Sequence, residues 1–87
     1  MTKGEFIQKA NQIGFDSRVF SLDGEFPSAG GWAVQNLMGG WKVYCVERGE
    51  IIDNTVKWFS SESDALEYLY DFYKKLRLKI DSQKLNF

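Results

Sequence analysis

The chain has 87 residues, a formal net charge of −1, one cysteine and no histidine. This length makes one small domain, and a single cysteine excludes an internal disulfide and a cysteine zinc site. The lack of histidine removes the commonest general base and metal ligand of proteins. Seven Phe, four Tyr and three Trp supply large side chains from which a small core can be built.

The first predicted helix covers residues 3–13. Thr2 and Glu5 have the spacing of a capping box, in which each side chain accepts a hydrogen bond from the other residue's backbone amide. Apolar residues then recur at helical spacing up to Gly14, which is a natural end. A helix this short is expected to be stable only when it is packed against the rest of the domain.

Four strands are predicted between the two helices. The first covers residues 18–23, and the loop that follows, residues 24–31, contains the only proline. The next two form a hairpin, which is followed by a turn region at 49–54 and a fourth strand at 55–60.

The hairpin is the strongest local signal in the chain. Gly39-Gly40 can supply the positive φ angles of a tight two-residue turn. With that turn, Met38 pairs with Trp41 and Val34 pairs with Cys45. A slip of one residue would exchange the two faces of one strand, so the assignment of faces depends on the position of the turn.

The last predicted helix begins at a serine cap, Ser60 or Ser61, and carries an apolar stripe from Ala65 to Ile80 that includes Phe72. The element order α-β-β-β-β-α predicts a two-layer α+β fold, in which a four-stranded antiparallel sheet carries both helices on one face. The other face is expected to remain open to water or to a partner. The domain is expected to cover 1–80, with a loose tail at 81–87.

No motif in the chain predicts catalysis. Glu47, Glu50 and Asp53 lie beside a turn, but nothing in their spacing forces them to converge on a substrate. The glycines do not match a phosphate-binding loop, because no lysine or helix start follows at the required spacing. Cys45 is expected to be a small buried apolar residue. We therefore expect a protein that is not an enzyme and that holds no metal or cofactor.

The charges are unevenly distributed along the chain. Residues 16–71 contain ten carboxylates and four bases, whereas residues 72–87 contain five bases and one carboxylate. The helix dipole accounts for the bases at the end of the last helix but not for the acids that precede it. Double-stranded-RNA-binding domains share this layout but place lysines where this helix has Ser61-Glu62-Ser63-Asp64, so no nucleic-acid partner is expected.

Three short segments carry a family resemblance. They are Trp41-Lys42-Val43-Tyr44, Glu47-Arg48-Gly49 and Trp58-Phe59-Ser60-Ser61-Glu62, followed by Ala65 and a helix. Together they resemble the small immunity proteins encoded beside bacterial polymorphic toxins and contact-dependent growth inhibition systems. The resemblance covers about the middle third of the chain. It implies a cytoplasmic inhibitor that binds one cognate toxin domain, commonly a nuclease, and blocks its active site or an essential surface.

Such toxins are often basic, so acidic turns on this chain would favour docking of that partner. An exposed aromatic ring on the open sheet face would supply an apolar anchor. The candidate partner-binding residues are Asp23, Glu25, Tyr44, Arg48, Glu50 and Asp53.

Two alternatives remain open from the sequence. Glu47 and Arg48 are also suited to bracing the turn by a salt bridge or by backbone hydrogen bonds, and Glu47 is predicted on the side that faces the helices. The competing function is that of a stand-alone regulatory or adaptor domain that binds another protein. The first ten residues contain no apolar run of signal-peptide length and no segment is predicted to span a membrane, so we expect a cytoplasmic location.

Overall fold

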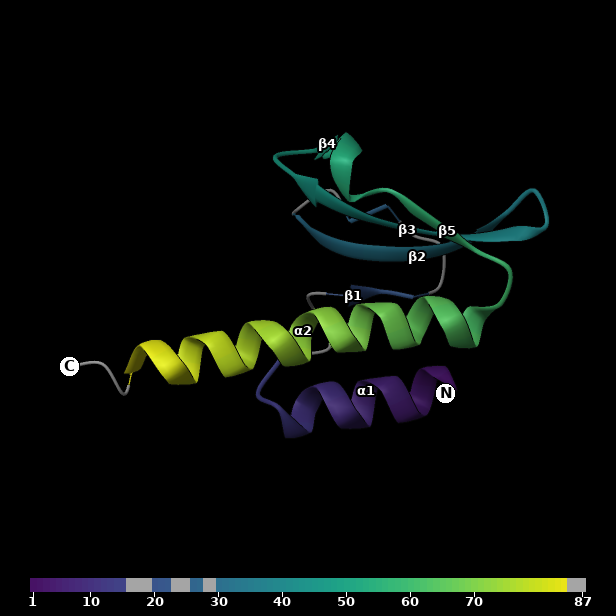
Figure 1. Ribbon diagram of the computed structural model, residues 1–87. Coiled ribbons are helices and arrows are strands. Elements are labelled where there is room, and N and C mark those ends of the chain that lie inside the picture. The colour runs from purple at the N-terminus through teal and green to yellow at the C-terminus, as the bar shows by residue number, and fades with distance from the viewer. Residues whose placement is uncertain (16–19, 23–25, 28–29, 85–87) are drawn as a thin grey trace.

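A computed structural model describes residues 1–15, 20–22, 26–27 and 30–84 of the chain (Figure 1). Two helices pack on one side of a five-stranded mixed sheet, which confirms the α+β class. In chain order the elements are α1 (Lys3–Gln12), β1 (Phe20–Ser21), β2 (Gly31–Leu37), β3 (Gly40–Glu47), β4 (Glu50–Ile51), the 3₁₀ helix η2 (Asp53–Thr55), β5 (Lys57–Phe59) and α2 (Glu62–Lys84).

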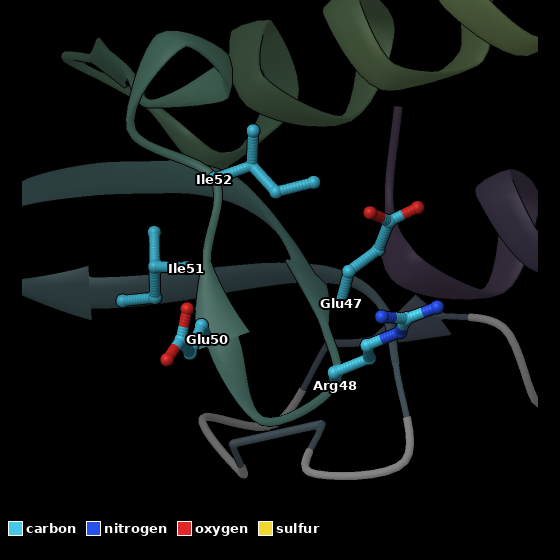
Figure 2. A pocket seen from close by; sticks show the side chains of 5 residues that line it. All are labelled: Glu47, Arg48, Glu50, Ile51 and Ile52. Carbon is cyan, nitrogen blue, oxygen red and sulfur yellow. The ribbon is translucent and has the colours of Figure 1, made fainter.

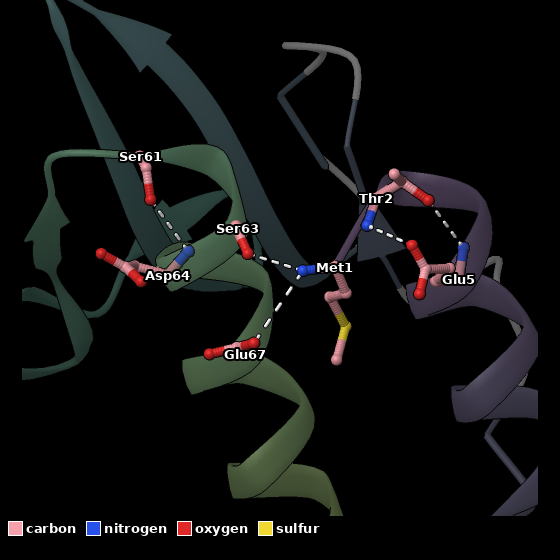
Figure 3. Close-up of polar contacts among 7 residues, drawn as sticks. All are labelled: Met1, Thr2, Glu5, Ser61, Ser63, Asp64 and Glu67. Atoms are coloured by element: carbon pink, nitrogen blue, oxygen red, sulfur yellow. Dashed lines mark hydrogen bonds and ion pairs between the residues drawn. The ribbon is translucent and has the colours of Figure 1, made fainter.

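The caps of both helices form as the sequence predicts (Figure 3). The amide of Thr2 donates to Oε1 of Glu5 and the amide of Glu5 donates to Oγ1 of Thr2, both at 3.2 Å. The hydrogen bonds that the carboxylate of Glu5 accepts from the backbone and side chain of Thr2 lower the pKa of Glu5. At the start of α2, the amide of Asp64 donates to Oγ of Ser61 at 3.1 Å. Helix α2 continues to Lys84, beyond residue 80, where the sequence placed the end of the domain.

The sheet is built around β3. Strand β2 pairs antiparallel with one side of β3, and the short strands β4 and β5 share its other side. Strand β1 pairs parallel with β2, which corrects the prediction of a wholly antiparallel sheet. Two strands joined by a tight hairpin must run antiparallel. β1 and β2 are instead separated by residues 22–30. A connection of that length can return the chain to the end of the sheet where β1 begins, as a parallel pair requires.

The turn between β2 and β3 lies one residue earlier than predicted. Leu37 pairs with Gly40, so the two turn residues are Met38 and Gly39, with φ angles of 53° and 79°. Each residue of β2 consequently pairs two positions earlier on β3 than expected. Because side chains alternate with a period of two, this shift leaves every paired residue on its predicted face, and only Met38 leaves the strand for the turn.

The main core lies between the sheet and the helices. From α1 it takes Phe6 and Ala10, from the sheet side Phe20, Leu22, Trp32, Val34 and Val43, and from α2 Ala65, Leu66, Leu69 and Tyr73. The Phe20 ring links the layers through edge contacts, with its centroid 4.8 Å from that of Phe6 and 4.9 Å from that of Tyr73. Burial raises the pKa of Tyr73 to about 12. Phe72, predicted in this core, is 41% exposed and contacts Trp32 at its margin.

Thr55 lies in η2, the segment between the edge strands β4 and β5, and links this segment to β3. Its hydroxyl accepts a hydrogen bond from the amide of Cys45 at 2.9 Å and donates one to the carbonyl of Ile52 at 2.6 Å. The amide of Ile52 donates in turn to the carbonyl of Cys45. A side-chain oxygen therefore replaces a backbone acceptor of the ladder where η2 leaves the sheet.

We expect Thr55→Val to lower the free energy of unfolding by about 1–3 kcal/mol, because the partly buried amide of Cys45 loses its acceptor. Urea denaturation measures the change, and Thr55→Ser, which keeps the hydroxyl, is the matched control. A loss in Thr55→Ser with none in Thr55→Val would show that the Thr55 methyl group, rather than the hydrogen bond, holds this edge.

Candidate functional site

One face of the sheet carries no helix, and we call it the helix-free face. The pairing register places on it Ala33, Gln35 and Leu37 of β2, Gly40, Lys42, Tyr44 and Val46 of β3, Ile51 of β4 and Trp58 of β5. The opposite face contributes Trp32, Val34 and Val43 to the main core. Strand alternation therefore sends the two sets of side chains to opposite sides.

Part of the helix-free face forms a second, smaller core. Ala33, Tyr44 and Val46 are buried there, and Ile51 and Val56 pack against them. This cluster buries the part of the helix-free face where β3 pairs with β4. The sequence predicted that the whole of this face would be open.

Tyr44 belongs to this second core and is only 1% exposed, so its predicted role as an exposed anchor is not available in this arrangement. The ring of Phe26 stacks over it, with centroids 6.4 Å apart and an interplanar angle of 29°. Burial raises the pKa of Tyr44, partly offset by a hydrogen bond with the side chain of Gln35. Tyr44 therefore supports the face from beneath, and Phe26 takes the exposed position.

Trp58 is the large exposed side chain of the helix-free face, with 53% of its surface accessible. It pairs with Lys42 across the strands and lies against Gly40, where an added Cβ would come within 3.3 Å of Cε3 of the indole ring. The φ angle of Gly40 is not positive, so the glycine here provides space for the ring rather than an unusual backbone conformation. Leu37, directly opposite Gly40, is also exposed.

The exposed apolar residues gather on this side of the domain. Among the described residues, the exposed large hydrophobic side chains are Phe26, Leu37, Met38, Trp58, Phe72 and Leu78. Leu37 and Trp58 lie on the helix-free face, Phe26 stacks on it, and Met38 occupies the turn at its end. The other two lie on α2.

We call the β3–β4 hairpin together with η2 the acidic end of the sheet, because it carries Glu47, Glu50 and Asp53. Glu47 and Glu50 are directly opposite each other, and like charges at such positions weaken strand pairing. Figure 2 shows their carboxylates turned away from each other, with the Arg48 side chain on the Glu47 side. With Ile51 and Ile52, these three residues line a shallow depression.

Glu47, Arg48, Glu50 and Asp53 are all exposed. Among the described side chains, no ion pair joins any of them to another residue. The structure therefore lends no support to Glu47 and Arg48 as a brace of the turn. Arg48 adopts a φ of 53° beside Gly49 at 79°, so the backbone alone makes a tight two-residue turn.

The predicted site residues thus have three outcomes. Arg48, Glu50 and Asp53 lie exposed at the acidic end, and Tyr44 is buried beneath the neighbouring face. Asp23 and Glu25 lie outside the described residues. The sequence reasoning missed Trp58 as a surface anchor, although it placed Val56 and Trp58 on one side of their strand.

The described residues offer no metal-binding group of three or more His, Cys, Asp or Glu side chains. Cys45 is half-buried, and its pKa is raised by burial and by the nearby charge of Glu47. Neither α1 nor α2 contains an apolar stretch of the length needed to cross a bilayer.

Comparison with known proteins gives no relative from which a function can be transferred. No protein-family model matches the chain, and no curated protein and no solved structure matches it. The resemblance to immunity proteins therefore stays a prediction, and the surface just described is the basis for a functional proposal.

Proposed function

We propose that this chain is an immunity protein that binds a cognate bacterial toxin domain and neutralises it in the cytoplasm. The observation that carries the proposal is the helix-free face, where Trp58 and Leu37 are exposed near the Met38 turn and Phe26 is exposed over Tyr44. Apolar residues gathered on one surface are typical of protein interaction sites. The family resemblance supplies the class of partner.

The energetic argument depends on Trp58. Tryptophan is enriched among the residues that dominate binding energy, because it brings a large rigid surface with few rotatable bonds. Gly40 leaves room for this ring to lie against β3. A partner that covers it gains apolar contact without first having to order the sheet.

The acidic end adds electrostatic attraction. Glu47, Glu50 and Asp53 are exposed, and only Arg48 opposes them between residues 47 and 53. A basic partner would be drawn toward this end and oriented by it, since opposite charges accelerate docking and fix its register.

The experiment that tests this proposal begins with the gene beside this one, which the proposal expects to encode a large secreted protein with a variable C-terminal toxin domain. Co-expression should restore growth to cells that produce that domain, and the purified proteins should form a stable complex. No binding and no protection would remove the immunity function. Stable binding without protection would favour the regulatory or adaptor function.

We expect the double variant Glu50→Lys/Asp53→Lys to associate about three- to tenfold more slowly with the toxin domain at low salt, because rim charges act mainly on the association rate. The difference should shrink at high salt, and the melting temperature should change little because both side chains are exposed. Stopped-flow mixing at two salt concentrations measures both rates.

Asp71→Lys is a matched control for Asp53→Lys, because it makes the same charge change on the exposed side of α2. It should leave the association rate close to that of the unmodified protein. Equal slowing by the two single variants would show that total charge, and not the acidic end, attracts the partner.

A further inference from the structure

Lys42 is the only charged residue at the described strand positions of the helix-free face. Its Nζ atom lies 5.1 Å from the ring centroid of Tyr44 and 6.0 Å from that of Trp58. Among the described side chains, no carboxylate comes within ion-pair distance of this ammonium group. A half-buried cation therefore lies beside the aromatic ring that is best placed to anchor a partner.

The position of Lys42 constrains what can cover Trp58. In the free protein, water solvates the part of the ammonium group that the rings leave open. A partner that packs over Trp58 removes this water, and a charge buried without a counter-charge is strongly destabilising. Aromatic rings compensate only part of that cost. A favourable complex therefore needs an anionic group of the partner at this point.

We propose that the partner places a carboxylate against Lys42, next to an apolar side chain that packs on Trp58 and Leu37. The inference rests on the proposed function for the existence of the partner, and it adds the chemistry of the segment that occupies the face. The charge of Lys42 selects the carboxylate, and the adjacent exposed rings and aliphatic groups select its apolar neighbour.

The two ends of the interface would then have opposite electrostatic roles. The acidic end, with Glu47, Glu50 and Asp53, attracts a basic surface from a distance. Lys42 contributes only once the two proteins are in contact, because it binds one acidic group at a fixed position beside the Tyr44 and Trp58 rings. A basic protein that lacks this acidic group would be attracted but not retained, which makes Lys42 a determinant of specificity.

The test measures equilibrium affinity and dissociation rate for the toxin domain encoded beside this gene. Lys42→Met removes the charge and keeps an unbranched side chain, and it should weaken binding by about tenfold or more, mainly through faster dissociation. Lys42→Arg retains the charge and should stay within about threefold of the unmodified protein. The melting temperature of each variant shows whether the fold is retained.

Lys57→Met is the matched control. Lys57 lies on the neighbouring strand and is exposed, but it pairs with Val43, whose side chain is in the main core, and so lies on the other face. This variant should bind within about twofold of the unmodified protein. Unchanged affinity of Lys42→Met, with intact binding by the unmodified protein, would overturn the inference and leave the proposed function in place.

A charge exchange identifies the partner's group. Lys42→Glu should abolish binding to the unmodified toxin domain, and changing each Asp and Glu of that domain to Lys in turn should restore binding at one position. If no such position restores binding, the proposal that a carboxylate of the partner contacts Lys42 is wrong. Failure of the unmodified protein to bind the toxin domain would instead overturn the proposed function.

Discussion

Phe6→Ala is expected to lower the free energy of unfolding by about 3–5 kcal/mol, the usual cost of emptying a buried aromatic site. Phe6 is fully buried, with 0% of its surface exposed, and its ring makes an edge contact with Phe20. Small domains have total stabilities of about 5–15 kcal/mol, so this single change removes a large share of the total.

The effect is large because α1 depends on its docking. The helix has 10 residues, too few to be stable alone in water, and its buried residues are Phe6 and Ala10. Loss of the Phe6 ring therefore weakens the main core and the attachment of the whole helix. Hydrogen exchange should show faster opening of α1 amides than of β3 amides in this variant.

Phe72→Ala is the comparison variant for Phe6→Ala. Helical spacing predicts Phe72 in the core, but 41% of it is exposed, so its truncation should cost about half as much as that of Phe6 or less. Urea denaturation of both variants measures the difference. Equal losses would mean that the margin of the main core is as tightly packed as its centre.

Trp58→Ala is expected to weaken binding to the toxin domain by about 2–4 kcal/mol, which corresponds to roughly 30-fold or more in affinity. The indole ring is 53% exposed in the free protein, lies against Gly40 and pairs with Lys42 across the strands. Its truncation removes the largest apolar surface that a partner can cover on the helix-free face. Isothermal titration calorimetry measures the change in affinity.

Leu78→Ala is the control for the removal of Trp58. Leu78 is also largely exposed, but it lies on α2, away from the helix-free face. Its truncation should leave the affinity unchanged. A larger loss from Leu78→Ala than from Trp58→Ala would place the interface on the helices.

Gly40→Ala examines the support of the Trp58 ring without removing the ring. The added Cβ would lie 3.3 Å from Cε3 of Trp58, which is close enough to displace the indole by a few tenths of an ångström. The backbone of Gly40 does not require glycine, so the fold should be retained. We expect an affinity between those of the unmodified protein and Trp58→Ala.

The sequence alone was sufficient for the features that depend on neighbouring residues. The capping box of Thr2 and Glu5, the serine cap of α2 and the tight hairpin between β2 and β3 were all predicted and are all present. Each depends on contacts between residues at most three or four positions apart, or on a strand pair joined by a short turn. The α+β class follows from the order of these elements.

The candidate site was predicted only in part, because burial depends on residues distant in the chain. The sequence identified Arg48, Glu50 and Asp53 as exposed, since they lie in or beside turns. It could not show that a second core buries Tyr44, because that requires Phe26, Ile51 and Val56 to gather over one face of the sheet.

The tertiary structure also decided the direction of β1, the position of the turn at Met38-Gly39 and the exposure of Phe72 and Trp58. The local pattern favours two glycines in the turn, but the structure uses Gly40 in the strand, where its missing side chain leaves room for Trp58. Helical spacing gives Phe72 the same periodicity as Leu69, yet the neighbouring Tyr73 takes the buried position and leaves the Phe72 ring at the margin of the core. Amphipathic spacing determines which side of an element is apolar, whereas only the packing of the layers determines how much of that side is covered.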